Sequence, residues 1–267
     1  MDAESLFRDG KLQEAITAQL NVVKKSPTDI EARFFLAELL AFRGDWERVD
    51  RQLETIINQS SKPPIVPLLF RQLVRAEIIR EQVFAEGRAP EVVVELDEFS
   101  KLQLEIATAV RLGHTDDFKS LVDQSEICRP IYTGSCNSKP FSLIQDVDDR
   151  LRGIAEVLTA TGKYFWIPWH SFRSLEFTPP EGPMDLIWRK AVVEVDGGPD
   201  GEVFIPSRYP SPNAWTVDQC LARSTDWIER DDAWATGVGQ RLLLIEDEGV
   251  PVMELSNITL NVNTIAN

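Results

Sequence analysis

The first sixty residues repeat an apolar helical pattern at a fixed interval. Gly10 and Gly44 lie 34 positions apart, which is the period of a tetratricopeptide unit. Aligned on that spacing, four pairs of positions coincide: Leu12 with Trp46, Ala15 with Val49, Gln19 with Leu53 and Val22 with Ile56. Glycine ends one helix in a left-handed turn and proline stops the next, as at Pro27. The pattern predicts tetratricopeptide-like helix pairs, and other antiparallel helix pairs fit it as well.

Local signals support further helices up to residue 128. Thr28–Glu31 is a capping box that begins one helix, and Asp45 is a candidate N-cap for a helix that runs to about Asn58. The segments Leu69–Phe84 and Val92–Leu112 are long enough to be helices, but the glycines that follow them break the period. We therefore expect about two repeats and two or three further helices, stacked as a short solenoid.

The stretch 129–143 is rich in turn-forming residues and has no period, which is typical of a linker. The acidic run Asp146–Asp149 is then expected to cap one more helix. The apolar residues of that helix follow the 3.6-residue spacing between Leu151 and Leu158, and Gly162 ends it.

After Gly162 the period changes to short apolar or alternating runs separated by glycine and proline turns. The predicted strands are Tyr164–Ile167, Arg173–Phe177, Lys190–Val195, Glu202–Ile205, Arg241–Ile245 and Val250–Leu255, with a short helical turn at Met184–Trp188. The predicted fold is α+β, with a helical repeat followed by a small, mostly antiparallel, β-barrel-like module. Its parts are the repeat domain 1–128, the linker 129–143 and the capping helix with the β module, 144–267.

Composition and charge narrow the class of partner. The chain of 267 residues carries 28 basic and 43 acidic side chains, for a net charge of −15. That charge disfavours nucleic acids and anionic membranes and leaves neutral or basic proteins as partners. We expect no secretory signal, no transmembrane helix and three reduced cysteines, all of which indicate the cytoplasm.

The sequence lacks the usual signatures of catalysis. Two histidines, His114 and His170, are too few for a three-histidine zinc site, and no P-loop, nucleophile elbow or dinucleotide motif occurs. We therefore expect no enzyme activity, no metal and no cofactor. The alternative is an enzyme whose site lies in the β module, around Glu176, Asp226 and His170.

Six of the seven tryptophans lie in the β module. Trp166, Trp169, Trp188 and Trp227 are expected in its core, because each lies in a strand-like run beside aliphatic residues. Trp215 and Trp234 lie in polar loops, where exposure would make them candidate binding residues.

Asp226, between Thr225 and Trp227, is expected to be partly buried and to pair with an arginine. Its candidate partners are Arg173, Arg189 and Arg241. Asp226 and Arg241 therefore join Trp166, Trp169 and Trp227 as expected structural residues of the module.

Several strings in the second half are specific in combination. They are Tyr164-Phe165-Trp166-Ile167-Pro168-Trp169, Arg173-Ser174-Leu175-Glu176-Phe177, Asp185-Leu186-Ile187-Trp188-Arg189, Glu202-Val203-Phe204-Ile205-Pro206, Thr225-Asp226-Trp227 and Gly239-Gln240-Arg241-Leu242-Leu243-Leu244. With them the chain resembles the ImpE/TagJ (SciE-type) accessory family of bacterial type VI secretion. The resemblance covers nearly the whole chain and is strongest from Gln145 to Leu255.

This resemblance implies a cytoplasmic, non-enzymatic accessory protein of the secretion machine. It implies binding to an N-terminal helix of the small contractile-sheath subunit and, through it, a link to the AAA+ unfoldase that recycles contracted sheath. The alternative in the same class is a chaperone or regulator of a secreted effector. In either case the partner would occupy the concave groove of the repeat.

Overall fold

The chain begins with two helix pairs in the computed structural model, which describes residues 1–62, 64–210, 215–230 and 234–261. The four helices are α1 (Ala3–Arg8), α2 (Leu12–Lys25), α3 (Ile30–Phe42) and α4 (Trp46–Gln59). Gly10 and Gly44 both take φ +75°, the left-handed turn that the repeat predicts. The alignment fails at one position, because Val22 is 43% exposed whereas Ile56 is buried. Membership of the tetratricopeptide class stays a prediction.

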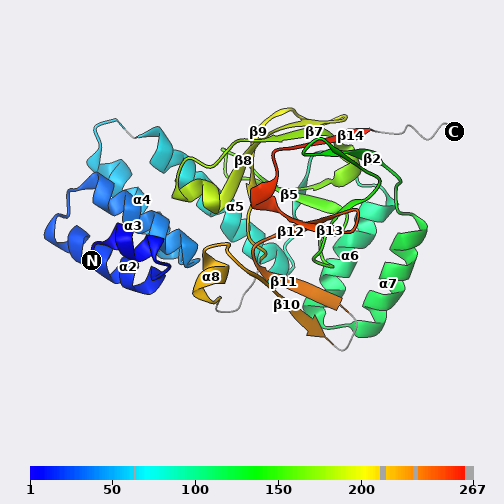
Figure 1. Ribbon diagram of the computed structural model, residues 1–267, viewed down its shortest axis with the longest axis horizontal. Helices are drawn as coiled ribbons and strands as arrows, with labels where there is room; N and C mark the ends of the chain where they lie inside the picture. The colour runs from blue at the N-terminus through cyan, green and yellow to red at the C-terminus, as the bar shows by residue number, and fades with distance from the viewer. Residues whose placement is uncertain (63, 211–214, 231–233, 262–267) are drawn as a thin grey trace.

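Three further helices follow; the first packs on α4, and the other two do not continue the stack. They are α5 (Ile65–Glu86), α6 (Glu98–Leu112) and α7 (Thr115–Ile127). Figure 1 shows α2–α4 at one end of the molecule, α6 and α7 at the other, and α5 between them. The prediction of one continuous solenoid is therefore wrong. No described helix is long and apolar enough to cross a membrane.

The sixth helix starts later than the apolar pattern predicts. Asp97 caps it, because its carboxylate accepts a hydrogen bond of 2.8 Å from the backbone N–H of Ser100. The residues before it, Glu91–Val92, form the short strand β1.

A nine-stranded sheet dominates the second half, in the order β1-β6-β5-β9-β8-β7-β14-β2-β3. Every neighbouring pair is antiparallel except β1 with β6. Its remaining strands are β2 (Thr133–Cys136), β3 (Lys139–Phe141), β5 (Ile154–Leu158), β6 (Tyr164–Pro168), β7 (Phe172–Phe177), β8 (Trp188–Val195), β9 (Gly201–Pro206) and β14 (Asn257–Asn261). Among the described strands β1 and β3 are open edges, so the sheet is not closed into a barrel, and the barrel-like form that we expected is not confirmed.

Two smaller sheets complete the module. One has the order β13-β12-β4, and the other is a ribbon of β10 (Thr225–Arg230) and β11 (Trp234–Gly239). The strands of the first are β4 (Ile144–Asp146), β12 (Leu242–Ile245) and β13 (Glu248–Pro251). Short helical turns are α8 (Val217–Cys220), η1 (Trp169–Ser171), η2 (Pro183–Leu186) and η3 (Val252–Glu254).

The nine-stranded sheet has an apolar core on each face, because side chains alternate along every strand. On one face Leu158, Trp166 and Trp188 share a core with the helices, including Phe70 of α5. On the other face a second core includes residues of β7, β8 and β14 together with Leu243 of β12. Helices and sheet therefore stabilise one another directly.

The helix predicted after Asp146–Asp149 is a strand instead. Residues Ile154–Leu158 form β5 at the interior of the sheet, and all five are buried. A short apolar run buried on both faces has no alternation, so its spacing also fits a helix. The aspartates shape a turn: Asp146 accepts from the N–H of Asp148, which accepts from the N–H of Arg150.

The segment 129–143 is also not an unstructured linker, since it contains β2 and β3. Asn137 and Ser138, between the two strands, take φ +48° and +66°, as a tight hairpin turn requires. Lys139 and Pro140 lie on β3 at the sheet edge, where both residue types discourage further strand pairing. The turn-forming residues of this segment therefore belong to a hairpin at the edge of the sheet. The division into domains stays a prediction.

Candidate functional site

A groove of about 860 Å³ opens where the helix pairs, α6 and the β10–β11 ribbon meet. We call it the central groove and define it by Arg43, Phe84, Ala107, Arg111, Trp215 and Ile228 among its lining residues. Arg43 comes from the α3–α4 turn, Phe84 from α5, Ala107 and Arg111 from α6, and Ile228 from β10. The groove thus draws on a turn, two helices and a strand that lie far apart in the sequence.

Several of the residues that line the groove are apolar. Ala85 of α5 and Ala107 of α6 present methyl groups, beside the half-buried ring of Phe84. Small side chains allow another backbone to approach closely, and Ile228, which is 43% exposed, supplies an apolar wall on the ribbon. Such a surface suits an apolar helix face better than a small polar substrate.

Both tryptophans proposed for binding line the central groove, but they are less exposed than expected. Trp234 is only 6% exposed, because it packs into a small core with Ile106 and Phe118. Its predicted exposure is therefore wrong: the strand β11 turns the ring inward. Trp215 is half-buried, and its ring lies over the guanidinium of Arg208 at 4.5 Å.

The charged residues of the groove differ in how they are partnered. Arg150 is held by Asp148 through two hydrogen bonds of 2.9 and 2.6 Å. Glu81 accepts a hydrogen bond of 2.6 Å from the indole N–H of Trp46. Arg43 and Arg111 are exposed, and neither forms an ion pair with a described carboxylate.

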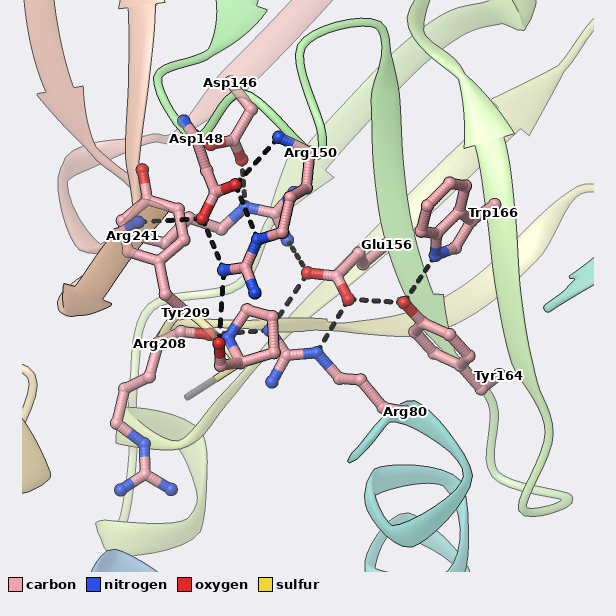
Figure 2. A network of polar contacts seen from close by, with 12 residues as sticks. Arg80, Asp146, Asp148, Arg150, Glu156, Tyr164, Trp166, Arg208, Tyr209 and Arg241 are labelled. Atoms are coloured by element: carbon pink, nitrogen blue, oxygen red, sulfur yellow. Dashed lines mark hydrogen bonds and ion pairs between the residues drawn. The ribbon is translucent and has the colours of Figure 1, made fainter. Parts of the chain in front are cut away.

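A buried network of charges fixes α5 against the sheet behind this groove (Figure 2). Arg80 of α5 donates two hydrogen bonds to Glu156 of β5, at 2.7 and 2.9 Å, and one of 2.7 Å to Glu77. Arg241 donates to the other side of the cluster, to Glu156 at 2.9 Å and to Asp146 at 2.6 Å. All five side chains are buried, so the network holds α5 firmly against the sheets.

The two carboxylates that Arg241 contacts titrate differently. Burial alone would raise the pKa of Glu156, but the attraction of Arg80 and Arg241 outweighs it and lowers that pKa to about 2. Burial raises the pKa of Asp146 to about 6, because Arg241 is the one cation that pairs with it among the described residues and Asp148 repels its charge. Glu156 is therefore the firmly ionised centre of the network.

Aromatic donors complete the network. The hydroxyl of Tyr164 donates to Glu156, and the indole N–H of Trp166 donates to that hydroxyl (Figure 2). Trp188 donates to Glu77 at 2.9 Å. Trp166, Trp169 and Trp188 are buried as predicted, whereas Trp227 is only half-buried, beside Tyr209.

The predicted pairing of Asp226 with an arginine is wrong. Asp226 is exposed on β10 and accepts a hydrogen bond only from the next backbone N–H among the described residues. Arg241 is buried as expected, but with Asp146 and Glu156. Arg189 donates to backbone carbonyls, including that of Met253 at 2.7 Å, and Arg173 pairs with Asp196.

The sequence reading missed Arg80 and Glu156. One signal existed: Glu156 interrupts the apolar run of β5, and an acidic residue inside such a run calls for a buried cation. Nothing local pointed to Arg80, which lies 76 positions away.

The alternative catalytic set is not assembled. Glu176 is exposed on β7 of the large sheet and Asp226 is exposed on the ribbon. His170 lies beside Asp97 at the start of α6, with 3.3 Å between Nε2 and Oδ2. Among the described residues, no hydrogen bond or ion pair joins any two of these three side chains. His114 is exposed and 3.1 Å from Asp117.

The fold and the groove define the class of this molecule: an α+β protein in which helix pairs and an open sheet share a core and flank one central groove. Residues 138–259 match the family model described as "ImpE protein". The Pseudomonas aeruginosa protein named "Type VI secretion system accessory component TagJ" is 28% identical over 261 residues, which are 97% of this chain and 90% of that protein. The X-ray crystal structure of protein VPA1032 from Vibrio parahaemolyticus superposes with a TM-score of 0.89 at 28% identity, covering 97% of both chains.

These matches confirm the resemblance that the sequence motifs indicated. The chain is similar to the ImpE/TagJ family, through the family model over residues 138–259 and the relative named TagJ over nearly its whole length.

Proposed function

We propose that this chain is a non-enzymatic accessory component of type VI secretion that works by binding another protein of the machine. The observation that supports it most is the similarity to the relative named TagJ, which extends over 97% of the chain and so includes helices, sheet and groove. An accessory role needs a binding surface rather than a reactive centre, and the central groove is such a surface.

The partner that we propose is an N-terminal helix of the small contractile-sheath subunit. A helix is about 10 Å wide and can place one apolar face on a groove through residues spaced three and four apart. The apolar floor formed by Phe84, Ala85 and Ala107, with Ile228 as a wall, offers contacts of that kind. Through the sheath, the chain would act in the cytoplasm beside the AAA+ unfoldase that recycles contracted sheath.

A secreted effector is the second candidate for the same groove. In that case the chain would be a chaperone or regulator, and the apolar floor would bind a helix of the effector. The two candidate partners can be distinguished, because only the sheath subunit would bring the unfoldase into the complex.

The experiment is a pull-down with the tagged chain from a lysate of its own source, analysed by mass spectrometry. We expect a sheath subunit, with or without the unfoldase, to be enriched. Enrichment of an effector without sheath would replace the first proposal by the second. Recovery of neither, by a bait whose circular dichroism shows it folded, would contradict both.

A variant pair connects the result to the groove. Ile228→Asp places a charge on the apolar wall and should abolish enrichment. Ile127→Asp makes the same change at the end of α7, where the side chain is 88% exposed and outside the groove, and should leave enrichment unchanged.

A further inference from the structure

One end of the central groove holds a hydrogen-bond donor that has no acceptor among the described residues. The indole Nε1 of Trp215 is buried and has no hydrogen-bond partner among the described residues. Arg43 lines the same end and lies beside Cys220. A buried donor without an acceptor costs about 1–3 kcal/mol, so such a group in an open groove indicates a place for an acceptor from outside.

The geometry behind Trp215 holds that donor in place. Arg208 lies under the indole ring, with its guanidinium carbon 4.5 Å from the ring centre. Arg208 itself is fixed by three backbone carbonyls, those of Phe42 at 2.7 Å, Cys220 at 2.9 Å and Ala41 at 3.2 Å. Arg43 and Arg208 are both next to Cys220, so Trp215, Arg208 and Arg43 are linked through neighbouring contacts.

Two cations of the groove have no carboxylate partner among the described residues. The groove is lined by three arginines and two glutamates, and of the arginines Arg150 is paired with Asp148. At physiological ionic strength the Debye length is about 8 Å, so a ligand in the groove is affected mainly by the nearest charges. These include the cations Arg43, at the α3–α4 turn, and Arg111, on α6, together with Glu229 on the ribbon.

We propose that the central groove selects an acidic amphipathic helix, with a carboxylate of that helix bound between Arg43 and the Trp215 indole N–H. The apolar face of the helix lies on Phe84 and Ala107, and Arg111 contacts a second acidic residue on the opposite flank. A carboxylate fits because it accepts several hydrogen bonds at once and because charge-assisted bonds to arginine are the stronger kind. This rests on the proposed function only in naming the groove as a helix-binding site.

The test uses two designed helical peptides with the same apolar face, one flanked by glutamate and the other by lysine. Their affinities for the full chain are measured by fluorescence anisotropy at 0.15 M salt. We expect the glutamate peptide to bind at least tenfold more tightly. Equal binding of the two, tighter binding of the lysine peptide, or no binding of the glutamate peptide at high micromolar concentration would each overturn the proposal.

Three variants assign the preference to the groove. Arg43→Glu should reverse the preference between the peptides. Trp215→Phe keeps an aromatic ring but removes the N–H, so it should weaken binding of the glutamate peptide by about tenfold. Lys101→Glu, on an exposed position of α6 outside the groove, should change neither affinity by more than twofold. A change in Lys101→Glu as large as in Arg43→Glu would show a general charge effect and contradict the proposal.

A peptide from the N-terminal helix of the sheath subunit separates this proposal from the proposed function. If that peptide fails to bind while the glutamate preference persists, the partner is wrong and the acidic selectivity stands. If it binds and Arg43→Glu has no effect, the partner stands and the selectivity is wrong.

Discussion

Arg80 on α5 donates two parallel hydrogen bonds to Glu156 on β5, at 2.7 and 2.9 Å, across 76 positions of sequence. Arg241 reaches the same carboxylate from the residue before β12. The helices and the two larger sheets are therefore joined by one ionised side chain. Because Arg150, which lines the central groove, lies close enough to be influenced by Glu156 and Arg80, the network also supports the groove wall.

Removing one partner from this network should be costly. Arg80→Met leaves Glu77 and Glu156 buried with fewer donors, and breaking a buried ion pair costs about 3–5 kcal/mol. We expect the free energy of unfolding, measured by urea titration, to fall by that amount. The matched control is Arg71→Met, which removes the more exposed pair with Asp50 and should cost about 1 kcal/mol or less. Equal losses in the two variants would contradict the role assigned to Arg80.

Glu38 gives the fold a dependence on pH. This α3 side chain is buried, and burial together with repulsion from Asp185 raises its pKa from 4.5 to about 7. A carboxyl whose pKa is raised in the folded state binds its proton more tightly there. Its contribution to stability is therefore full below about pH 4.5 and is lost as the pH rises to about 7.

Glu38→Gln should remove this dependence. Relative to wild type, the variant should gain up to about 3 kcal/mol at pH 8 and little at pH 4.5. The measurement is the urea midpoint at several pH values, with the exposed carboxyl of Glu105 on α6, changed to Gln, as the control. A variant that follows the wild-type pH curve would show that Glu38 does not titrate in this range.

Much of the local structure was readable from the sequence, and the failures share a physical cause. The helix pairs and strands β6–β9 were predicted because one face of each helix is apolar and turn residues separate the strands. The strand β5 was read as a helix because both of its faces are buried and it has no alternation. The groove could not be predicted, since Arg43, Ala107, Trp215 and Ile228 come together only through the tertiary fold.

The hairpin at 133–141 offers a direct check on the segment that was read as a linker. A side chain at Gly134 would place its Cβ 2.1 Å from the backbone oxygen of Thr259 on β14. Backbone cannot yield as a flexible side chain does, so Gly134→Ala should destabilise the fold by at least about 2 kcal/mol. At Gly182 a Cβ meets nothing within 4 Å, and Gly182→Ala should be nearly neutral. The stability of both variants is measured by thermal unfolding. If both substitutions have an equally mild effect, β2 is not firmly paired with β14.

Arg208 connects stability to binding, and one substitution tests both. Its guanidinium donates hydrogen bonds to three backbone carbonyls at the ends of α3 and α8, and it lies under the ring of Trp215. Arg208→Met leaves those carbonyls unpaired, so we expect a loss of about 3 kcal/mol or more in the free energy of unfolding. Arg173→Met, at an exposed ion pair, should lose about 1 kcal/mol or less.

The same Arg208→Met protein should also bind the glutamate-flanked helix more weakly, because the Trp215 indole then loses the guanidinium that it lies over. Affinity is measured at a temperature where circular dichroism shows the variant fully folded, so that lost stability does not imitate lost binding. We expect the folded variant to bind at least fivefold more weakly than wild type. If the affinity is unchanged, the stacking of Arg208 on Trp215 stabilises the fold without positioning the donor.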